Sequence, residues 1–133
     1  MSVEDEPKIN VEKQIAYWRS EALETWKDVD HSMGGGRIAF GLFAAHLSVE
    51  KAIKAHVVKD TRKLSPMIHN LVSLANLTDL QLTSKQLDVL ADLNPMNILT
   101  RYPVEAGGIP SRGEADVLVK RAKEVFEWLI EKL

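Results

Sequence analysis

A line of polar side chains inside an apolar segment is the first place where this sequence could do chemistry. His46, Glu50 and Lys54 follow one another at intervals of four, so on a helix they would lie on one face. Polar groups are costly to bury unless they are paired. The line therefore fits either an internal ion pair between Glu50 and Lys54, in the order that stabilises a helix, or an anion site with Lys51 or Lys54 as the cation.

Two further polar pairs could contribute to such a site. His69-Asn70 stands where a short helix is predicted to begin, and the free N–H groups of a helix N-terminus suit a phosphate. The alternative is that one of the two residues simply caps that helix. Arg101-Tyr102 precedes Pro103, and there a guanidinium could hold a phosphate while the ring stacks on a base. Equally, this pair could anchor its loop to the rest of the protein.

Several other kinds of site are excluded by the residue types present. The chain has no cysteine, which removes disulfides, thiolate nucleophiles and cysteine-based metal sites. Its four histidines are scattered and none belongs to a zinc-binding HExxH pattern, so no metal and no cofactor is expected. The glycines at 34–36 precede a helix but lack the Gly-Lys-Ser/Thr ending of a phosphate loop. No Ser/His/Asp arrangement can be argued either.

Length and composition indicate one globular domain. The chain has 133 residues, 45% of them hydrophobic and 27% charged, which is enough to bury a core. A formal net charge of −2 gives no bulk attraction for nucleic acid, so any such binding would need a local patch. The first ten residues are acidic and polar, unlike a secretory leader, and no apolar run suits a membrane helix. The default expectation is a cytoplasmic protein.

The first half of the chain predicts two long helices. Over about 10–30 apolar residues recur every three or four positions, at Ile15, Trp18, Ala22, Trp26 and Val29. Asn10 is the predicted N-cap of this helix, and the glycines at 34–36 are predicted to end it. The segment 37–58 is apolar on nearly all sides. Such a helix is expected to be buried all round, either at the centre of a bundle or with one face in an oligomer interface.

The second half predicts shorter helices and one loop. A connector at 61–66 leads to a helix at 69–77, and Thr83 with Gln86 forms a capping box that opens a helix ended by Asn94-Pro95. Residues 95–112 are expected to be an irregular surface loop. Ser111 and Glu114 form another capping box, which opens the final helix. No strand pattern is found, so we expect an all-α, up-and-down bundle of four to five helices at 10–133, after a flexible tail at 1–9.

Several short motifs, taken together, resemble the HEPN domain family. They are the stretch from Ala39 to Ala55, then Pro66 to Leu71, Leu93-Asn94, Thr100 to Pro103, Tyr17-Trp18 at the front and Ala122 to Glu124 in the closing helix. The resemblance covers residues 10–133. It implies a helical bundle that pairs into a homodimer. HEPN proteins are commonly encoded beside a minimal nucleotidyltransferase; some are RNA-cleaving toxins and others look like nucleotide- or substrate-binding partners.

The resemblance also selects residues. The ribonuclease branch carries an Arg and, after four to six intervening residues, a His; Arg62 and His69 match that count formally, but their segment contains Ser65-Pro66 and joins two early helices. In the branch that this chain resembles most, the recurring groups are a Glu-Lys pair, a His-Asn pair and Arg-Tyr-Pro. They correspond here to Glu50, Lys51, His69, Asn70, Arg101, Tyr102 and Pro103, with Lys54 as a neighbour.

Three functions follow as hypotheses. The first is a dimeric binding module in which Glu50, Lys51, Lys54, His69, Asn70, Arg101 and Tyr102 hold a nucleotide or another anion, acting as partner of a nucleotidyltransferase in a system like the toxin–antitoxin pairs. The second is a metal-independent endoribonuclease, with His69 as general acid or base and Arg62 or Arg101 stabilising the phosphate. The third is a purely structural dimerisation module whose polar residues all form internal pairs.

Overall fold

The computed structural model describes residues 8–133, and within that range it contains helices and no strands. In chain order the elements are α1 (Val11–Gly34), α2 (Ile38–Thr61), α3 (Leu71–Ala75), α4 (Ser84–Leu93), the 3-10 helix η2 (Asn94–Ile98) and α5 (Arg112–Glu131). The predicted all-α fold is confirmed. Of the predicted tail, residues 1–7 lie outside the described range. No helix in the described part of the chain is long and apolar enough to cross a membrane.

The first helix begins at its predicted N-cap and ends at the predicted glycines. The side chain of Asn10 accepts a hydrogen bond from the backbone N–H of Lys13 at 3.0 Å, so Asn10 is the N-cap. The helix continues beyond position 30 to Gly34 because Met33, one turn after Val29, extends the buried stripe. Gly36 then adopts a φ of 76°, which a side chain rarely tolerates, and the chain turns back.

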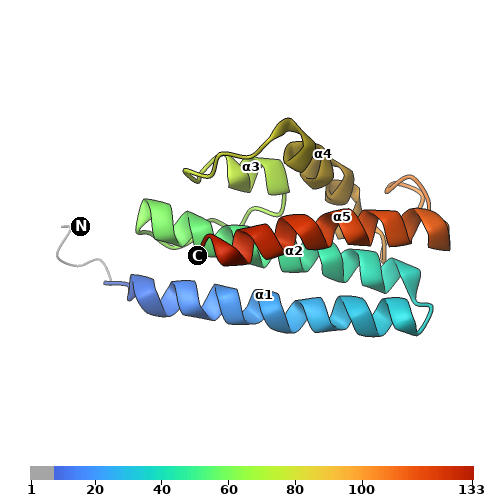
Figure 1. Cartoon of the computed structure of the whole chain (residues 1–133), viewed down its shortest axis with the longest axis horizontal. Coiled ribbons are helices and arrows are strands. Elements are labelled where there is room, and N and C mark those ends of the chain that lie inside the picture. Colours follow the sequence, from blue (N-terminus) through green and yellow to red (C-terminus); the bar gives the residue numbers. More distant parts are fainter. Residues whose placement is uncertain (1–7) are drawn as a thin grey trace.

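The second helix is the centre of the bundle. Figure 1 shows α2 lying along α1 on one side and covered by α5, α3 and α4 on the other. The prediction of burial at the centre of a bundle is confirmed for α2 from Gly41 to Val58, whereas Phe40 near its start is exposed. Two contacts tighten this packing. A Cβ at Gly41 would lie 2.5 Å from the Sδ of Met33, so α1 and α2 approach closely there. Trp26 of α1 stacks on Phe126 of α5, with ring centroids 4.8 Å apart.

The predicted loop at 95–112 is partly wrong. Its first residues form η2, because Pro95 stands in the first turn of that helix, where no backbone N–H is needed. Met96 and Leu99 are buried in the core and fix this segment to the bundle. The side chain of Asn94 also accepts a hydrogen bond from the backbone N–H of Leu71 at 2.9 Å, which ties η2 to the start of α3.

The remaining helix starts follow their caps. Asn70 accepts a hydrogen bond from the backbone N–H of Ser73, and α3 is shorter than the predicted 69–77. Both predicted capping boxes, at Thr83 and at Ser111, are formed. The caps at Asn70 and Ser111 decide where the connectors at 62–70 and 99–111 end, and these two connectors carry the exposed polar residues of the site.

The C-cap of α2 offers a test of the fold. Arg62 has a φ of 59°, in the left-handed region that favours glycine. Arg62→Gly should raise the free energy of unfolding by about 0.5 kcal/mol. This net figure includes the loss of the exposed ion pair between Arg62 and Glu12, which contributes little. Urea denaturation of both proteins measures the change, with Glu12→Gln isolating the ion pair. A clear loss of stability in Arg62→Gly would contradict the left-handed backbone conformation of Arg62.

Candidate functional site

Glu50 is the centre of the polar cluster on α2. Its side chain is almost fully buried, and its two oxygens have different partners. Oε2 lies 3.1 Å from the Nζ of Lys54, so the predicted internal ion pair is formed. Oε1 lies 3.1 Å from the Nδ1 of His69, which comes from the connector between α2 and α3. The buried carboxylate therefore joins the central helix to a surface segment.

Lys54 is buried together with its partner. Its side chain is 9% exposed, and its ammonium group lies 5.2 Å from the ring centroid of Trp18 on α1. An ammonium over an indole face is attracted by the ring, more strongly when water is excluded. Lys54 thus has a carboxylate on one side and an aromatic ring on another, which compensates for its removal from water.

His46 lies behind this pair and carries no charge at neutral pH. It is 1% exposed, and its Nδ1 is 3.9 Å from Oε1 of Glu50, too far for a hydrogen bond. Neither ring nitrogen has a hydrogen-bond partner within residues 8–133. Burial lowers the pKa of His46 from 6.5 to about 4, and the nearby Glu50 only partly opposes this.

A cavity of about 440 Å³ lies beside the cluster. Its walls come from α2, from the connector before α3 and from the segment that begins in η2; the lining residues are Phe43, His69, Asn97, Ile98, Thr100, Arg101 and Tyr102. The backbone N–H groups of Arg101 and Tyr102 both donate to the carbonyl of Ile98, which holds the turn that presents the two side chains. The structure therefore brings together three of the predicted residues: His69, Arg101 and Tyr102.

Glu50 and Lys54 do not line this cavity, and Glu50 is joined to it through His69. Lys51 is directed to the other side of α2. Its Nζ contacts Oε1 of Glu21 at 3.2 Å and Oγ1 of Thr25 at 2.9 Å, both on α1. One residue along a helix is a rotation of about 100°, which separates Lys51 from its neighbour Glu50.

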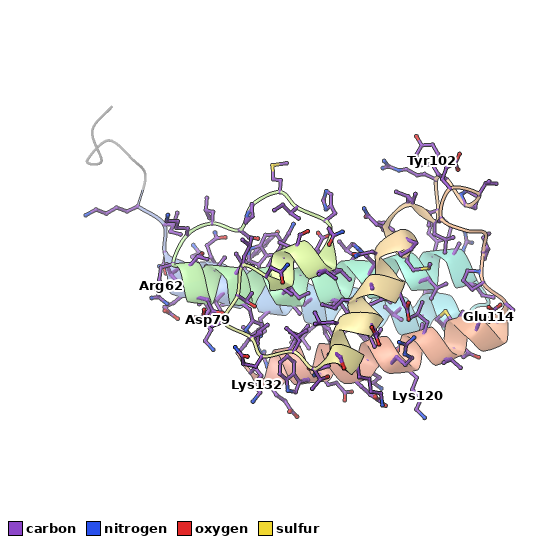
Figure 2. All side chains as sticks on the ribbon, turned by 90° about the horizontal axis from the view of Figure 1, so that it is seen from above. Arg62, Asp79, Tyr102, Glu114, Lys120 and Lys132 are labelled. Atoms are coloured by element: carbon purple, nitrogen blue, oxygen red, sulfur yellow. The ribbon has the colours of Figure 1, made fainter. Side chains whose placement is uncertain are left out.

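Two more predicted residues lie away from the cavity walls. The side chain of Asn70 caps α3, the alternative considered for it. Arg62 is at the C-cap of α2, where it contacts Glu12 at 3.1 Å. Figure 2 shows Arg62 and Tyr102 near opposite ends of the molecule. The spacing between Arg62 and His69 therefore does not place Arg62 at this cavity.

Some residues of the cavity were missed by the sequence argument. Asn97 and Thr100 add polar groups, and Phe43 and Ile98 add an apolar wall. Asn97 and Ile98 gave no signal of their own, and Phe43 and Thr100 lay within the family motifs without being selected as site residues. Within residues 8–133 there is no group of three or more His, Asp or Glu side chains that could hold a metal ion.

The family model of the HEPN domain matches residues 15–133. The chain belongs to the HEPN domain family. Among solved structures, it is similar to the crystal structure of TT1696 from Thermus thermophilus, with a TM-score of 0.77 and 23% sequence identity over 90% of this chain and 98% of that one. At this identity the similarity shows the fold alone. No curated protein gives a significant match to the chain.

The buried His46 predicts that this HEPN domain is sensitive to acid. Between pH 6.5 and 4 the unfolded chain binds a proton at this histidine and the folded chain does not, so the free energy of unfolding falls as the pH falls. The loss should reach on the order of 3 kcal/mol near pH 4, since one pKa unit corresponds to about 1.4 kcal/mol.

Urea denaturation curves recorded from pH 7.5 to pH 4, in steps of about half a pH unit, measure this effect. His46→Gln is the matched control, because it lacks the titrating ring and keeps every other ionisable group, including the buried His56. The prediction is contradicted if wild type and His46→Gln lose stability equally over this range.

Proposed function

We propose that this HEPN protein is a dimeric binding module that holds a nucleotide, or a related phosphate-bearing anion, in the cavity formed by His69, Arg101 and Tyr102. The observation that supports it best is the meeting of these three side chains, from two separate connectors, on one cavity. A guanidinium can hold phosphate oxygens in pairs, and an exposed phenol ring can stack on a base. The cavity volume lies in the range of small-molecule sites, about 300–1,000 Å³.

The charges around the cavity support an anionic ligand. Arg101 is the one lysine or arginine among the lining residues, and no carboxylate lines the cavity. Within residues 8–133 the Arg101 side chain forms no hydrogen bond or ion pair, in contrast to Lys51 and Lys54, which are both paired. Arg101 is also exposed. Its positive charge is therefore available to a ligand.

The partner and the dimer are proposed on the basis of the family. HEPN proteins commonly stand beside a minimal nucleotidyltransferase, and we propose such an enzyme as partner, in a system like the toxin–antitoxin pairs of the cytoplasm. Exposed apolar residues at one end of the bundle support self-association. Phe40, Val104, Ile109 and Val117 are exposed, and Figure 1 shows the start of α2, the loop before α5 and the start of α5 at the same end of the bundle.

The contact between His69 and Glu50 favours an endoribonuclease as the second candidate. A carboxylate that binds Nδ1 orients an imidazole for proton transfer at its other nitrogen, and Arg101 could stabilise phosphate charge. We rank this function second because cleavage by acid and base needs two proton-transfer groups. His69 is the one histidine among the lining residues, and no carboxylate lines the cavity beside it.

Isothermal calorimetry at low salt, with adenosine mono- and triphosphate and a polyanion as probes, tests the binding function. Arg101→Ala should weaken nucleotide binding at least roughly tenfold, because a charge-assisted hydrogen bond is lost. Arg121→Ala is the control, since Arg121 contacts Asp92 across α4 and α5 and does not line this cavity. Wild-type protein that gives no heat with any probe would refute the proposal. If wild-type protein degrades RNA and His69→Ala does not, the second candidate is established instead.

Light scattering coupled to gel filtration tests the dimer. Wild type should have twice the chain mass of 14.9 kDa, and Val104→Asp or Val117→Asp should shift it toward the monomer by placing a charge in the apolar surface. Leu64→Asp, in the connector after α2, is the control with a similarly exposed apolar residue. A wild-type protein that is monomeric at every concentration would exclude the dimer.

A further inference from the structure

His69 stands between the buried cluster and the cavity. Its Nδ1 is 3.1 Å from Oε1 of Glu50, while its side chain is 60% exposed and lines the cavity. An ionised carboxylate can only accept hydrogen bonds, so the hydrogen between these atoms belongs to Nδ1. In a neutral imidazole the other nitrogen, Nε2, is then an acceptor. Nε2 has no hydrogen-bond partner within residues 8–133.

Lys54 is the reason that Glu50 acts as an acceptor. The ammonium group of Lys54 lies 3.1 Å from Oε2 of Glu50, so the buried carboxylate is paired with a cation. Lys54 is itself held in place against the ring of Trp18. His46 contributes no positive charge, because burial lowers its pKa to about 4. Glu50 and Lys54 thus balance each other, and the proton on Nδ1 of His69 is fixed by contacts that lie behind the cavity.

We propose that Lys54 and Glu50 are positioning residues that hold His69 with its proton on Nδ1, so that the cavity selects phosphate-bearing ligands with a free hydroxyl group, as in a ribonucleotide. Arg101 binds the phosphate and Nε2 of His69 accepts a hydrogen bond from the hydroxyl. This inference rests on the proposed function. It adds a hydrogen-bond acceptor at a defined place in the cavity, which Arg101 alone, a donor, would not provide.

The selectivity follows from the cost of an unpaired acceptor. A ligand that fills the cavity but has no hydroxyl removes water from Nε2 and leaves this acceptor without a hydrogen-bond donor. Sites built to bind a hydroxyl reject analogues that lack it for this reason. Because the His69 side chain is 60% exposed, we expect the affinities for ligands with and without the hydroxyl to differ roughly tenfold, less than in a fully closed site.

Nitrogen NMR of the histidine rings tests the positioning role directly. In wild type at neutral pH, His69 should show a protonated Nδ1 and an unprotonated Nε2. Lys54→Met should shift the proton toward Nε2, because the buried Glu50 then loses the cation that balances its charge. Lys51→Met is the matched control: it removes the neighbouring lysine, whose ammonium contacts Glu21 and Thr25 on α1. If Lys54→Met does not fold, Lys54→Gln replaces it. A wild-type ring with its proton on Nε2 overturns the inference.

Calorimetry with adenosine monophosphate and its dideoxy analogue, which lacks both ribose hydroxyls, tests the selectivity. Wild type and Lys51→Met should bind the ribonucleotide roughly tenfold more tightly than the dideoxy analogue. In Lys54→Met the ratio of the two affinities should approach one, while phosphate binding through Arg101 persists. Equal affinity of wild type for the two nucleotides overturns the inference and leaves the proposed function intact. If neither nucleotide binds, the proposed function fails together with the selectivity, and the NMR result still decides the positioning role.

Discussion

The carboxylate of Glu50 has to be paired, because it lies in the middle of the helix that every other part of the bundle covers. Removing a charge from water is costly, and a single partner seldom compensates for it. Here the compensation comes from Lys54 on the same helix and from His69 on the connector before α3. Trp18 on α1 covers the Lys54 ammonium in turn. Pairing one buried charge thus fixes three separate segments relative to each other.

This arrangement explains why the exposed cavity residues are well placed although they stand on connectors. His69 is oriented by a buried group, and Arg101 and Tyr102 are held by backbone hydrogen bonds to Ile98. The segment before them is anchored by Met96 and Leu99 in the core. Side chains on loops make a precise site only when their own surroundings restrict them. In this protein the restriction comes from the core on one side and from the buried carboxylate on the other.

The sequence predicted the fold better than the site, for physical reasons. Helical period and capping residues such as Asn10 and Thr83 are local signals, so the helices could be predicted closely. The direction of Lys51 could not, because only the position of α1 decides which partner the ammonium reaches. The wall formed by Asn97 and Ile98 belongs to η2, and η2 depends on core contacts of Met96 that no short pattern shows.

The balance of charge around Glu50 also bears on the choice between binding and catalysis. A carboxylate behind a catalytic histidine stabilises the imidazolium that forms during proton transfer. Glu50 is already neutralised by the ammonium of Lys54 at 3.1 Å, so it has less charge to offer to a protonated His69. Its hydrogen bond still orients the ring and fixes which nitrogen carries the proton. Glu50 therefore orients His69 more than it activates it, and this arrangement suits recognition of a ligand better than its cleavage.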